Sequence, residues 1–275
     1  MPQAYRSALY TVMERAVRKA GKQLVRDFGE VEHLQVSVKG PSDFVSTADH
    51  ASERTLKAEL EKARPGYSFL MEESGSTRGT DRDHVWIVDP LDGTTNFLHG
   101  IPHFAISVAL EHKGELLAGM IYNPAVDELY WAEKGKGAYL NDRRLRVSGR
   151  RDMGESLIGT GIPFRGRGTD EDHKHYLKLL GATMARTAGL RRPGAAALDL
   201  AYVAAGRFDG FFEIGLNKWD IAAGILMIRE AGGFVGDMDG GPDPMQTGNI
   251  VTGNAKLFDP LRGFLRELGG SGKSA

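Results

Sequence analysis

The sequence predicts a mixed α/β protein in which helices and sheets alternate in layers. Segments with apolar residues at helical spacing alternate with short apolar runs typical of buried strands. The segment 103–139 also carries turn residues at the spacing of an antiparallel sheet. No internal repeat or linker divides the 275 residues, so we expect one layered domain over 1–268. Its halves would span about 1–150 and 151–268, followed by a disordered tail at 269–275.

The composition is that of a globular protein without cysteine. The 35 Lys and Arg balance 36 Asp and Glu to a net charge of −1, and 41% of the residues are apolar. No apolar run reaches the ~20 residues of a membrane helix, and no secretory signal is visible, so we expect a cytoplasmic protein. The absence of cysteine excludes disulfides, thiolate catalysis and cysteine-ligated metals.

Charge is uneven along the chain. The segment 143–192 holds 12 Lys and Arg against 5 Asp and Glu, a net +7. Such a segment could meet an anionic substrate, a nucleic acid or an acidic partner, or it could simply be a solvated surface.

The first half begins with a predicted amphipathic helix, since apolar residues between Leu9 and Phe28 recur every three or four positions. Ser46, with Asp49 three residues later, is typical of a residue that caps a second helix. The expected strands of this half before residue 103 are 34–38, 67–71 and 85–88.

The second half repeats the alternation of strands and helices. We expect strands at 157–161, 208–214 and 249–252, and helices at 173–180, 195–205, 219–231 and 260–268.

An acidic octapeptide follows the strand at 85–88. Asp89 and Asp92 are three residues apart at its end, with Pro90 between them and the Leu91 carbonyl as a third oxygen. Oxygen-only ligands favour a hard cation, Mg²⁺ above all. The following segment 93–95 offers backbone N–H groups at a predicted helix start, which is an anion site. The competing interpretation is an Asp-Gly turn with a helix cap, but the combination favours a functional site.

Further polar residues stand at the edges of apolar elements, and each alone is unremarkable. Their order along the chain is what resembles a known family. The motifs are Lys39…Asp43…Thr47-x-Asp49, Glu72-Glu73-Ser74, Asp89-Pro90-Leu91-Asp92-Gly93-Thr94-Thr95-Asn96-Phe97, Gly194 to Arg207, Phe211 to Gly215 and Trp219-Asp220-x-Ala222-Ala223-Gly224. This set resembles the inositol monophosphatase family, and in its second half the bacterial SuhB type.

The resemblance implies an α/β/α/β/α layered sandwich and Mg²⁺-dependent, lithium-sensitive hydrolysis of a phosphate monoester, with inositol 1-phosphate as the expected substrate. It also implies two or three Mg²⁺ ions and a homodimer. SuhB-type proteins are further linked to transcription antitermination, ribosomal RNA synthesis and RNA polymerase, which adds possible partners.

Carried over position by position, the family pattern implies roles for individual residues. The metal ligands would be Glu72, Asp89, Leu91 (through its carbonyl), Asp92 and Asp220, with a weaker third ion near Glu72. The catalytic residues would be Asp49, Thr94, Glu72 and Lys39, with Thr94 and Asp49 activating the attacking water. The substrate-binding set would be Glu72, Leu91, Asp92, Gly93, Thr94, Thr95, Arg191, Gly194, Ala195, Ala196, Glu213 and Asp220.

Two features leave questions about the substrate side. The animal members carry a serine-bearing loop near the substrate, whereas the segment 159–164 has no serine, and Thr160 is its only hydroxyl. Arg191 is expected to help hold the substrate and Arg192 to point away from it, because side chains alternate along extended chain. Arg192 would then be available to a transcription factor or another subunit.

Other enzyme classes lack their motifs. The Asp89–Asp92 spacing of three differs from the spacing of two that an aspartyl-phosphate phosphatase needs, and neither a P-loop nor a nucleophile elbow occurs. The pairs His99/His103 and His173/His175 lack further ligands and are expected to be surface or packing residues. Histidinol phosphate, fructose bisphosphate and a 3′-phosphonucleotide stay open as alternative substrates.

Overall fold

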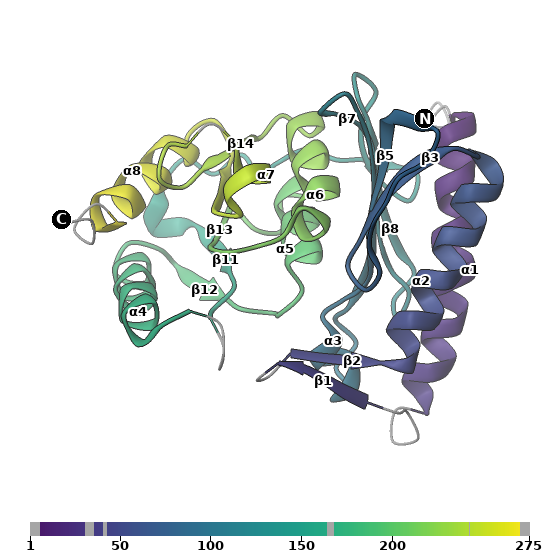
Figure 1. Cartoon of the computed structure of the whole chain (residues 1–275). Coiled ribbons are helices and arrows are strands. Elements are labelled where there is room, and N and C mark those ends of the chain that lie inside the picture. Colours follow the sequence, from purple (N-terminus) through teal and green to yellow (C-terminus); the bar gives the residue numbers. More distant parts are fainter. Residues whose placement is uncertain (1–5, 31–35, 41–42, 164–167, 242, 270–275) are drawn as a thin grey trace.

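The chain folds into five alternating layers of helices and sheets (Figure 1), which confirms the predicted sandwich. The computed structural model describes residues 6–30, 36–40, 43–163, 168–241 and 243–269. None of the helices in these ranges is both long and apolar enough to cross a membrane.

The first two layers are a helix pair and a large sheet. Helices α1 (Ala8–Gly29) and α2 (Thr47–Ala63) cover one face of an eight-stranded sheet, and a small hairpin of β1 (Val36–Gly40) and β2 (Asp43–Ser46) precedes α2. The order in the large sheet is β10-β9-β8-β7-β6-β5-β3-β4. Its strands are β3 (Tyr67–Met71), β4 (Gly75–Thr77), β5 (Asp81–Asp92), β6 (Ala105–His112), β7 (Glu115–Asn123), β8 (Glu128–Glu133), β9 (Gly137–Leu140) and β10 (Arg143–Arg144).

Only β3 and β5 run parallel in this sheet, and β5 to β10 form an antiparallel meander, as the turn spacing predicts.

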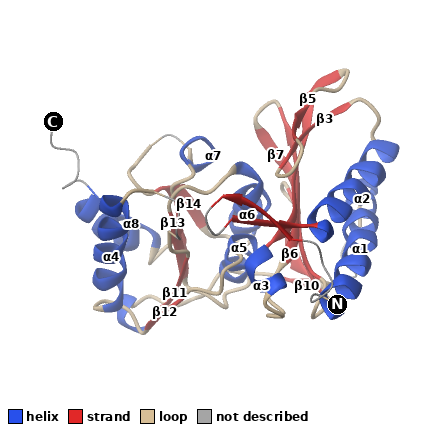
Figure 2. Ribbon diagram, turned by 60° about the horizontal axis from the view of Figure 1, so that its bottom comes forward, coloured by secondary structure: helices blue, strands red, loops and turns tan. Residues whose placement is uncertain are grey.

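The remaining layers come from the second half of the chain. Helices α5 (Ala196–Ala204) and α6 (Lys218–Glu230) lie between the two sheets (Figure 2). The second sheet has the order β12-β11-β13-β15-β14, and α4 (Asp170–Met184) and α8 (Phe258–Gly269) cover its outer face. Its strands are β11 (Leu157–Thr160), β12 (Gly189–Arg191), β13 (Gly210–Glu213), β14 (Phe234–Asp237) and β15 (Ile250–Gly253); the short helices are α3 (Thr94–Leu98) and α7 (Pro244–Thr247).

Each gap between layers holds its own apolar cluster, because strand side chains alternate between faces. In β5, Trp86 and Val88 pack under α1 and α2, whereas Ile87 packs against α5 and α6. Burial on both faces explains why the 85–88 run is continuously apolar.

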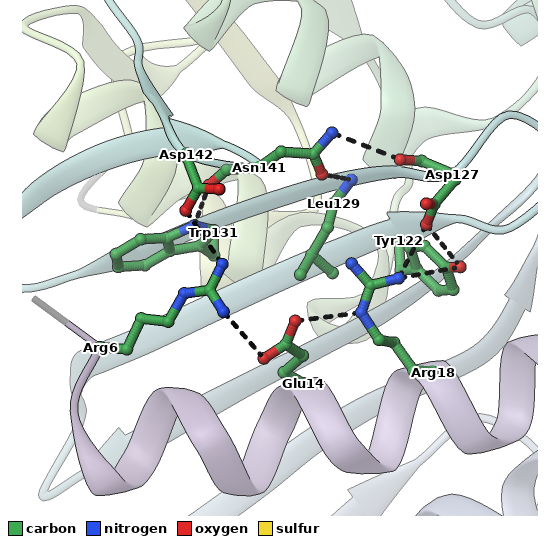
Figure 3. A network of polar contacts seen from close by, with 9 residues as sticks. All are labelled: Arg6, Glu14, Arg18, Tyr122, Asp127, Leu129, Trp131, Asn141 and Asp142. Atoms are coloured by element: carbon green, nitrogen blue, oxygen red, sulfur yellow. Dashed lines mark hydrogen bonds and ion pairs between the residues drawn. The ribbon is translucent and has the colours of Figure 1, made fainter. Parts of the chain in front are cut away.

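Polar contacts tie α1 to the turns of the large sheet (Figure 3). Arg18 donates to Asp127 at 2.7 Å, and Tyr122 donates its hydroxyl to the same carboxylate at 2.9 Å. Glu14 accepts from Arg18 at 3.0 Å, and Arg6 reaches Asp142 at 2.9 Å. Polar contacts thus add to the apolar packing that holds α1 on the large sheet.

Several boundaries differ from the sequence expectation. The strand expected at 85–88 is part of the longer β5, which continues through Pro90 to Asp92. The short elements β2, β4, β10, β12, β14 and α7 were not predicted. The expected strand at 34–38 lies partly outside the described residues, as does most of the tail expected from 269.

Candidate active site

Two aspartates at the end of β5 face the same side of the sheet. In a regular strand, residues three apart point to opposite faces. Here Asp89 pairs with Ser107 and Asp92 with Ala105, so three steps on β5 oppose two on β6. The extra residue is a β-bulge, a position where proline is tolerated, and it returns Asp92 to the face of Asp89. Both carboxylates therefore lie toward α5 and α6.

Two further acids join this cluster from neighbouring elements. Glu72 directly follows β3, and its N–H donates to the Val88 carbonyl at 3.2 Å, which places it beside Asp89. Asp220 lies in the first turn of α6 and accepts from the N–H of Asn217 at 2.7 Å in a capping box. The cap interpretation and the functional interpretation of Asp220 are thus compatible, since the cap anchors one carboxylate oxygen.

The backbone after Asp92 turns sharply into α3. Gly93 has φ of 87°, and a Cβ there would lie 3.0 Å from the His103 carbonyl oxygen, so this position needs glycine. The turn brings Gly93, Thr94 and Thr95 to the wall of a pocket that Glu72, Asp89 and Asp92 also line. The residues at the start of α3 and the acidic residues thereby line one space.

Thr94 and Asp49 meet at the edge of this pocket. Thr94 Oγ1 lies 3.1 Å from Asp49 Oδ1 and 3.0 Å from the Leu91 carbonyl oxygen, so its single proton can go to either acceptor. Ser46 is the capping residue of α2, as predicted, and Asp49 completes the capping box, since its Oδ2 accepts from the N–H and the hydroxyl of Ser46 at 2.8 and 2.6 Å. The capping box therefore orients the carboxylate that contacts Thr94.

The second half of the chain closes the pocket. The N–H of Ala197 donates to Asp92 Oδ2 at 2.7 Å, which brings Gly194, Ala195 and Ala196 to the pocket wall. Glu213, at the end of β13, also lines it. A Cβ at Gly161 would lie only 1.9 Å from Glu213 Oε1, so glycine makes room for this carboxylate.

The clustered acids raise one another's pKa values. Burial, followed by the charges of Glu72, Asp92 and Asp220, raises the pKa of Asp89 well above its ordinary value. Burial and then Asp220 raise the pKa of Asp92, although the Ala197 hydrogen bond opposes this. Buried acids with raised pKa values are typical of functional sites, because the clustered negative charge lacks compensation.

The acids line a pocket and do not form a finished metal cage. Among the described residues, no three Asp, Glu or His side chains already enclose one point as metal ligands. Glu72 instead hydrogen-bonds Asp89. The donor set is nevertheless all oxygen and strongly acidic, which fits a hard divalent cation.

The structure separates some residues that the sequence pattern grouped together. Arg192 lines the pocket, whereas Arg191 lies outside it and donates to the Leu190 carbonyl oxygen at 2.8 Å. The two side chains lie on different sides of the chain, as expected, but Arg192 lines the pocket where Arg191 was predicted to do so. Thr160 does not replace the missing serine, since its hydroxyl is buried against Tyr176 at 2.9 Å and Gly161 at 2.9 Å. Lys39 lies in β1, and its side chain is outside the described part of the structure.

Two residues that face each other beside the pocket, Asp199 and His103, were not predicted as functional. Asp199, in the first turn of α5, lines the pocket, and its Oδ1 lies 3.9 Å from Nε2 of His103. Burial and then the charges of Glu213 and Asp92 raise the pKa of Asp199, and burial lowers the pKa of His103. The two residues are far apart in sequence, and no local pattern links them.

Comparisons with known proteins agree with this fold and site. The family model described as "Inositol monophosphatase family" matches residues 6–267. The chain is 62% identical to the inositol-1-monophosphatase of Mesorhizobium japonicum over 90% of this chain and 92% of that protein. It is 46% identical to the Nus factor SuhB of Pseudomonas aeruginosa over 90% of this chain and 92% of that protein.

A solved structure of a relative has the same fold. The extragenic suppressor protein suhB of Bartonella henselae superposes with a TM-score of 0.91 at 56% identity, over 95% of this chain and 99% of the other. Fold and site together define a phosphatase. The chain belongs to the inositol monophosphatase family.

Proposed function

We propose that the protein hydrolyses myo-inositol 1-phosphate in a Mg²⁺-dependent reaction. The observation that carries this proposal is the pocket that Asp89 and Asp92 line together with Gly93, Thr94 and Thr95. A phosphate monoester is a dianion, so its hydrolysis needs positive charge on one side and hydrogen-bond donors on another.

Two or three Mg²⁺ ions fit the acidic wall. Glu72, Asp89 and the Leu91 carbonyl would hold one ion, with Asp89 shared by a second that Asp92 and Asp220 complete, and a weaker third near Glu72. Bound there, Mg²⁺ would offset the charge of the phosphate and make a coordinated water easier to deprotonate. The raised pKa values of Asp89 and Asp92 support this, because a cation relieves the repulsion that causes them.

The chain's own groups would do the positioning. Thr94, oriented by Asp49, would hold the attacking water and pass its proton to the carboxylate. The amides of Gly93, Thr94 and Thr95 would hold phosphate oxygens. The alcohol would face Asp92, Glu213, Asp220, Gly194, Ala195 and Ala196, and Lys39 would lie near the waters of the acidic wall.

Phosphate release tests the proposal. The substrates are myo-inositol 1-phosphate, histidinol phosphate, fructose bisphosphate and a 3′-phosphonucleotide, each with Mg²⁺, with EDTA and with Mg²⁺ plus Li⁺. We expect the highest kcat/KM for the inositol phosphate, no activity with EDTA, inhibition by Li⁺, and loss of most activity in Asp89→Asn. The control is Asp172→Asn, which alters an exposed capping acid of α4 away from the pocket. Full turnover in EDTA would contradict the metal requirement, and a better alternative substrate would move the assignment to that ester.

Binding to a transcription antitermination factor or RNA polymerase is a second candidate function. It is favoured by the similarity to a Nus factor and by the exposed Arg191 in the basic segment 143–192. Arg191→Glu should weaken capture of such a partner in a pull-down while phosphate release continues. Sedimentation of the same variant tests the expected homodimer. Both functions fit the cytoplasmic location predicted from the sequence.

A further inference from the structure

We propose that Asp199, positioned beside His103, is a specificity residue that binds a hydroxyl group of the alcohol part of the substrate. This inference rests on the proposed function, since it names a contact within the same pocket. Asp199 is placed there by α5, whose first turn is fixed when Ala197 donates its N–H to Asp92.

The side chain of Asp199 is deeply buried but poorly satisfied. Only 2% of it is exposed, and its Oδ1 makes no hydrogen bond to any described residue. The facing Nε2 of His103 is likewise buried and without a partner in the described part of the chain. At 3.9 Å the two atoms are too far apart for a hydrogen bond. Buried polar groups are nearly always paired, so an unpaired carboxyl at a pocket wall indicates that a ligand supplies the partner.

Other buried aspartates of the same half show what a structural aspartate looks like. Asp237 accepts from the N–H groups of Asp239 and Gly241 at 2.9 and 2.7 Å. Asp209 also has one buried oxygen, Oδ1, without a partner among the described residues, but its Oδ2 accepts from the N–H of Leu157 at 2.7 Å and pairs with Arg150 at 3.3 Å. Neither of them lines the pocket. The contrast argues that Asp199 is not kept to hold the fold together.

His103 is held on one side of Asp199 by contacts of its ring and its main chain. Its ring packs edge-on against Tyr202 with centroids 5.8 Å apart, and the Arg207 guanidinium lies 4.9 Å from the Tyr202 ring. The main-chain carbonyl oxygen of His103 accepts a hydrogen bond from the Asn96 side chain at 2.8 Å. Because His103 Nε2 lies 3.9 Å from Asp199 Oδ1, beyond hydrogen-bond distance, the carboxyl group of Asp199 keeps hydrogen-bonding capacity for a ligand. A carboxyl group accepts a hydrogen bond from an alcohol in either protonation state.

The chemistry of the pocket points to a polyol. Asp199 lines the same pocket as Glu213 and Asp92, and it is close enough to both for their charges to raise its pKa. Neighbouring carboxyl groups can share the several hydroxyls of a cyclitol or sugar, whereas a hydroxyl-free ester offers them no partner.

The test compares Asp199→Leu with the wild type on two esters, myo-inositol 1-phosphate and the hydroxyl-free p-nitrophenyl phosphate. We expect the ratio of their kcat/KM values to fall about tenfold, mainly through the KM of the inositol ester. Asp199→Asn should keep most of the preference, because an amide still bonds hydroxyls. The melting temperature of Asp199→Leu should equal or exceed that of the wild type, since an unpaired buried acid is removed. Asp209→Asn, the matched control, should keep the ratio and melt lower.

The outcomes separate this inference from the proposed function. If the wild type itself shows no preference for the inositol ester, the proposed substrate is wrong and the inference falls with it. If the wild type shows the preference and Asp199→Leu retains it, only the role of Asp199 is wrong. A lowered melting temperature with equal loss on both esters would also overturn the inference, because it indicates a structural residue.

Discussion

Asp92 accepts a hydrogen bond of 2.7 Å from the backbone N–H of Ala197, and this bond joins the two halves of the chain inside the pocket. Asp92 ends a strand of the first sheet, whereas Ala197 lies in the first turn of α5, 105 residues later. A carboxylate at a helix start is stabilised by the exposed N–H groups there. Asp92 therefore helps to assemble the pocket as well as to charge it.

The hydroxyl of Thr94 should matter for turnover. Thr94→Val keeps the shape of the side chain but removes the proton path to Asp49, so kcat should fall by roughly 10²–10⁴ with little change in KM. Steady-state phosphate release measures both constants. Thr55→Val is the control, since the Thr55 hydroxyl donates to the Ala51 carbonyl within α2 at 2.9 Å. An unchanged kcat in Thr94→Val would show that the water is activated elsewhere.

Asp89 should make the metal-free protein less stable as the pH rises. Burial raises its pKa in the folded state well above the ordinary value of an aspartate, so the folded form holds its proton more tightly than the unfolded form. The resulting stability is present at low pH and is lost as the pH rises through the folded pKa. In EDTA, Asp89→Asn should therefore melt higher than the wild type at neutral pH, and the difference should vanish near about pH 4. Melting curves across this range check the sign, and a variant less stable at every pH would contradict it.

Mg²⁺ should stabilise the fold through the same acids. Saturating Mg²⁺ should raise the unfolding free energy of the wild type by roughly 1–3 kcal/mol, and much less in Asp220→Asn. Thermal melts with and without the ion measure this. Asp172→Asn alters an equivalent capping box on α4, so it should keep the full Mg²⁺ response. An equal response in Asp220→Asn would place the ion at another site.

The two adjacent arginines should have different effects. Arg192 lines the pocket, so Arg192→Ala should raise the KM for the phosphate ester, by up to about tenfold for an exposed charge. Arg191→Ala is the matched control and should leave KM unchanged, because this guanidinium lies outside the pocket. The opposite result would restore the assignment expected from the sequence.

Much of the fold was predictable, since its long elements carry clear periodicity. The helix α1 and the antiparallel meander after residue 103 follow their patterns closely. The missed elements β2, β4, β10, β12, β14 and α7 have two to four residues, too few to display a period. The extension of β5 through Pro90 was hidden because proline usually ends a strand, whereas a bulge accommodates it.

The site was predictable only in part. The residues of one motif, 89–95, indicated acids and amides in one place, and the structure brings them together. The phase of Arg191 and Arg192 could not be predicted, since alternation says nothing about which face meets the pocket. His103 and Asp199 meet through tertiary packing alone, so no local sequence pattern predicts that they lie close together.

The close contact between α6 and the large sheet makes Gly119 a spacer for the active site. A Cβ at this position would lie 2.9 Å from the Ala223 Cα, which is main chain and cannot move aside alone. Leu200 presses on the other side of the helix, 2.5 Å from where a Cβ of Gly224 would stand. Because α6 carries Asp220 in its first turn, a single added methyl group on β7 would shift the whole helix and misalign a carboxylate that it never touches. The position of Asp220 in the active site thus depends on a contact in the core, where Gly119 leaves space for a hydrogen atom but not for a methyl group.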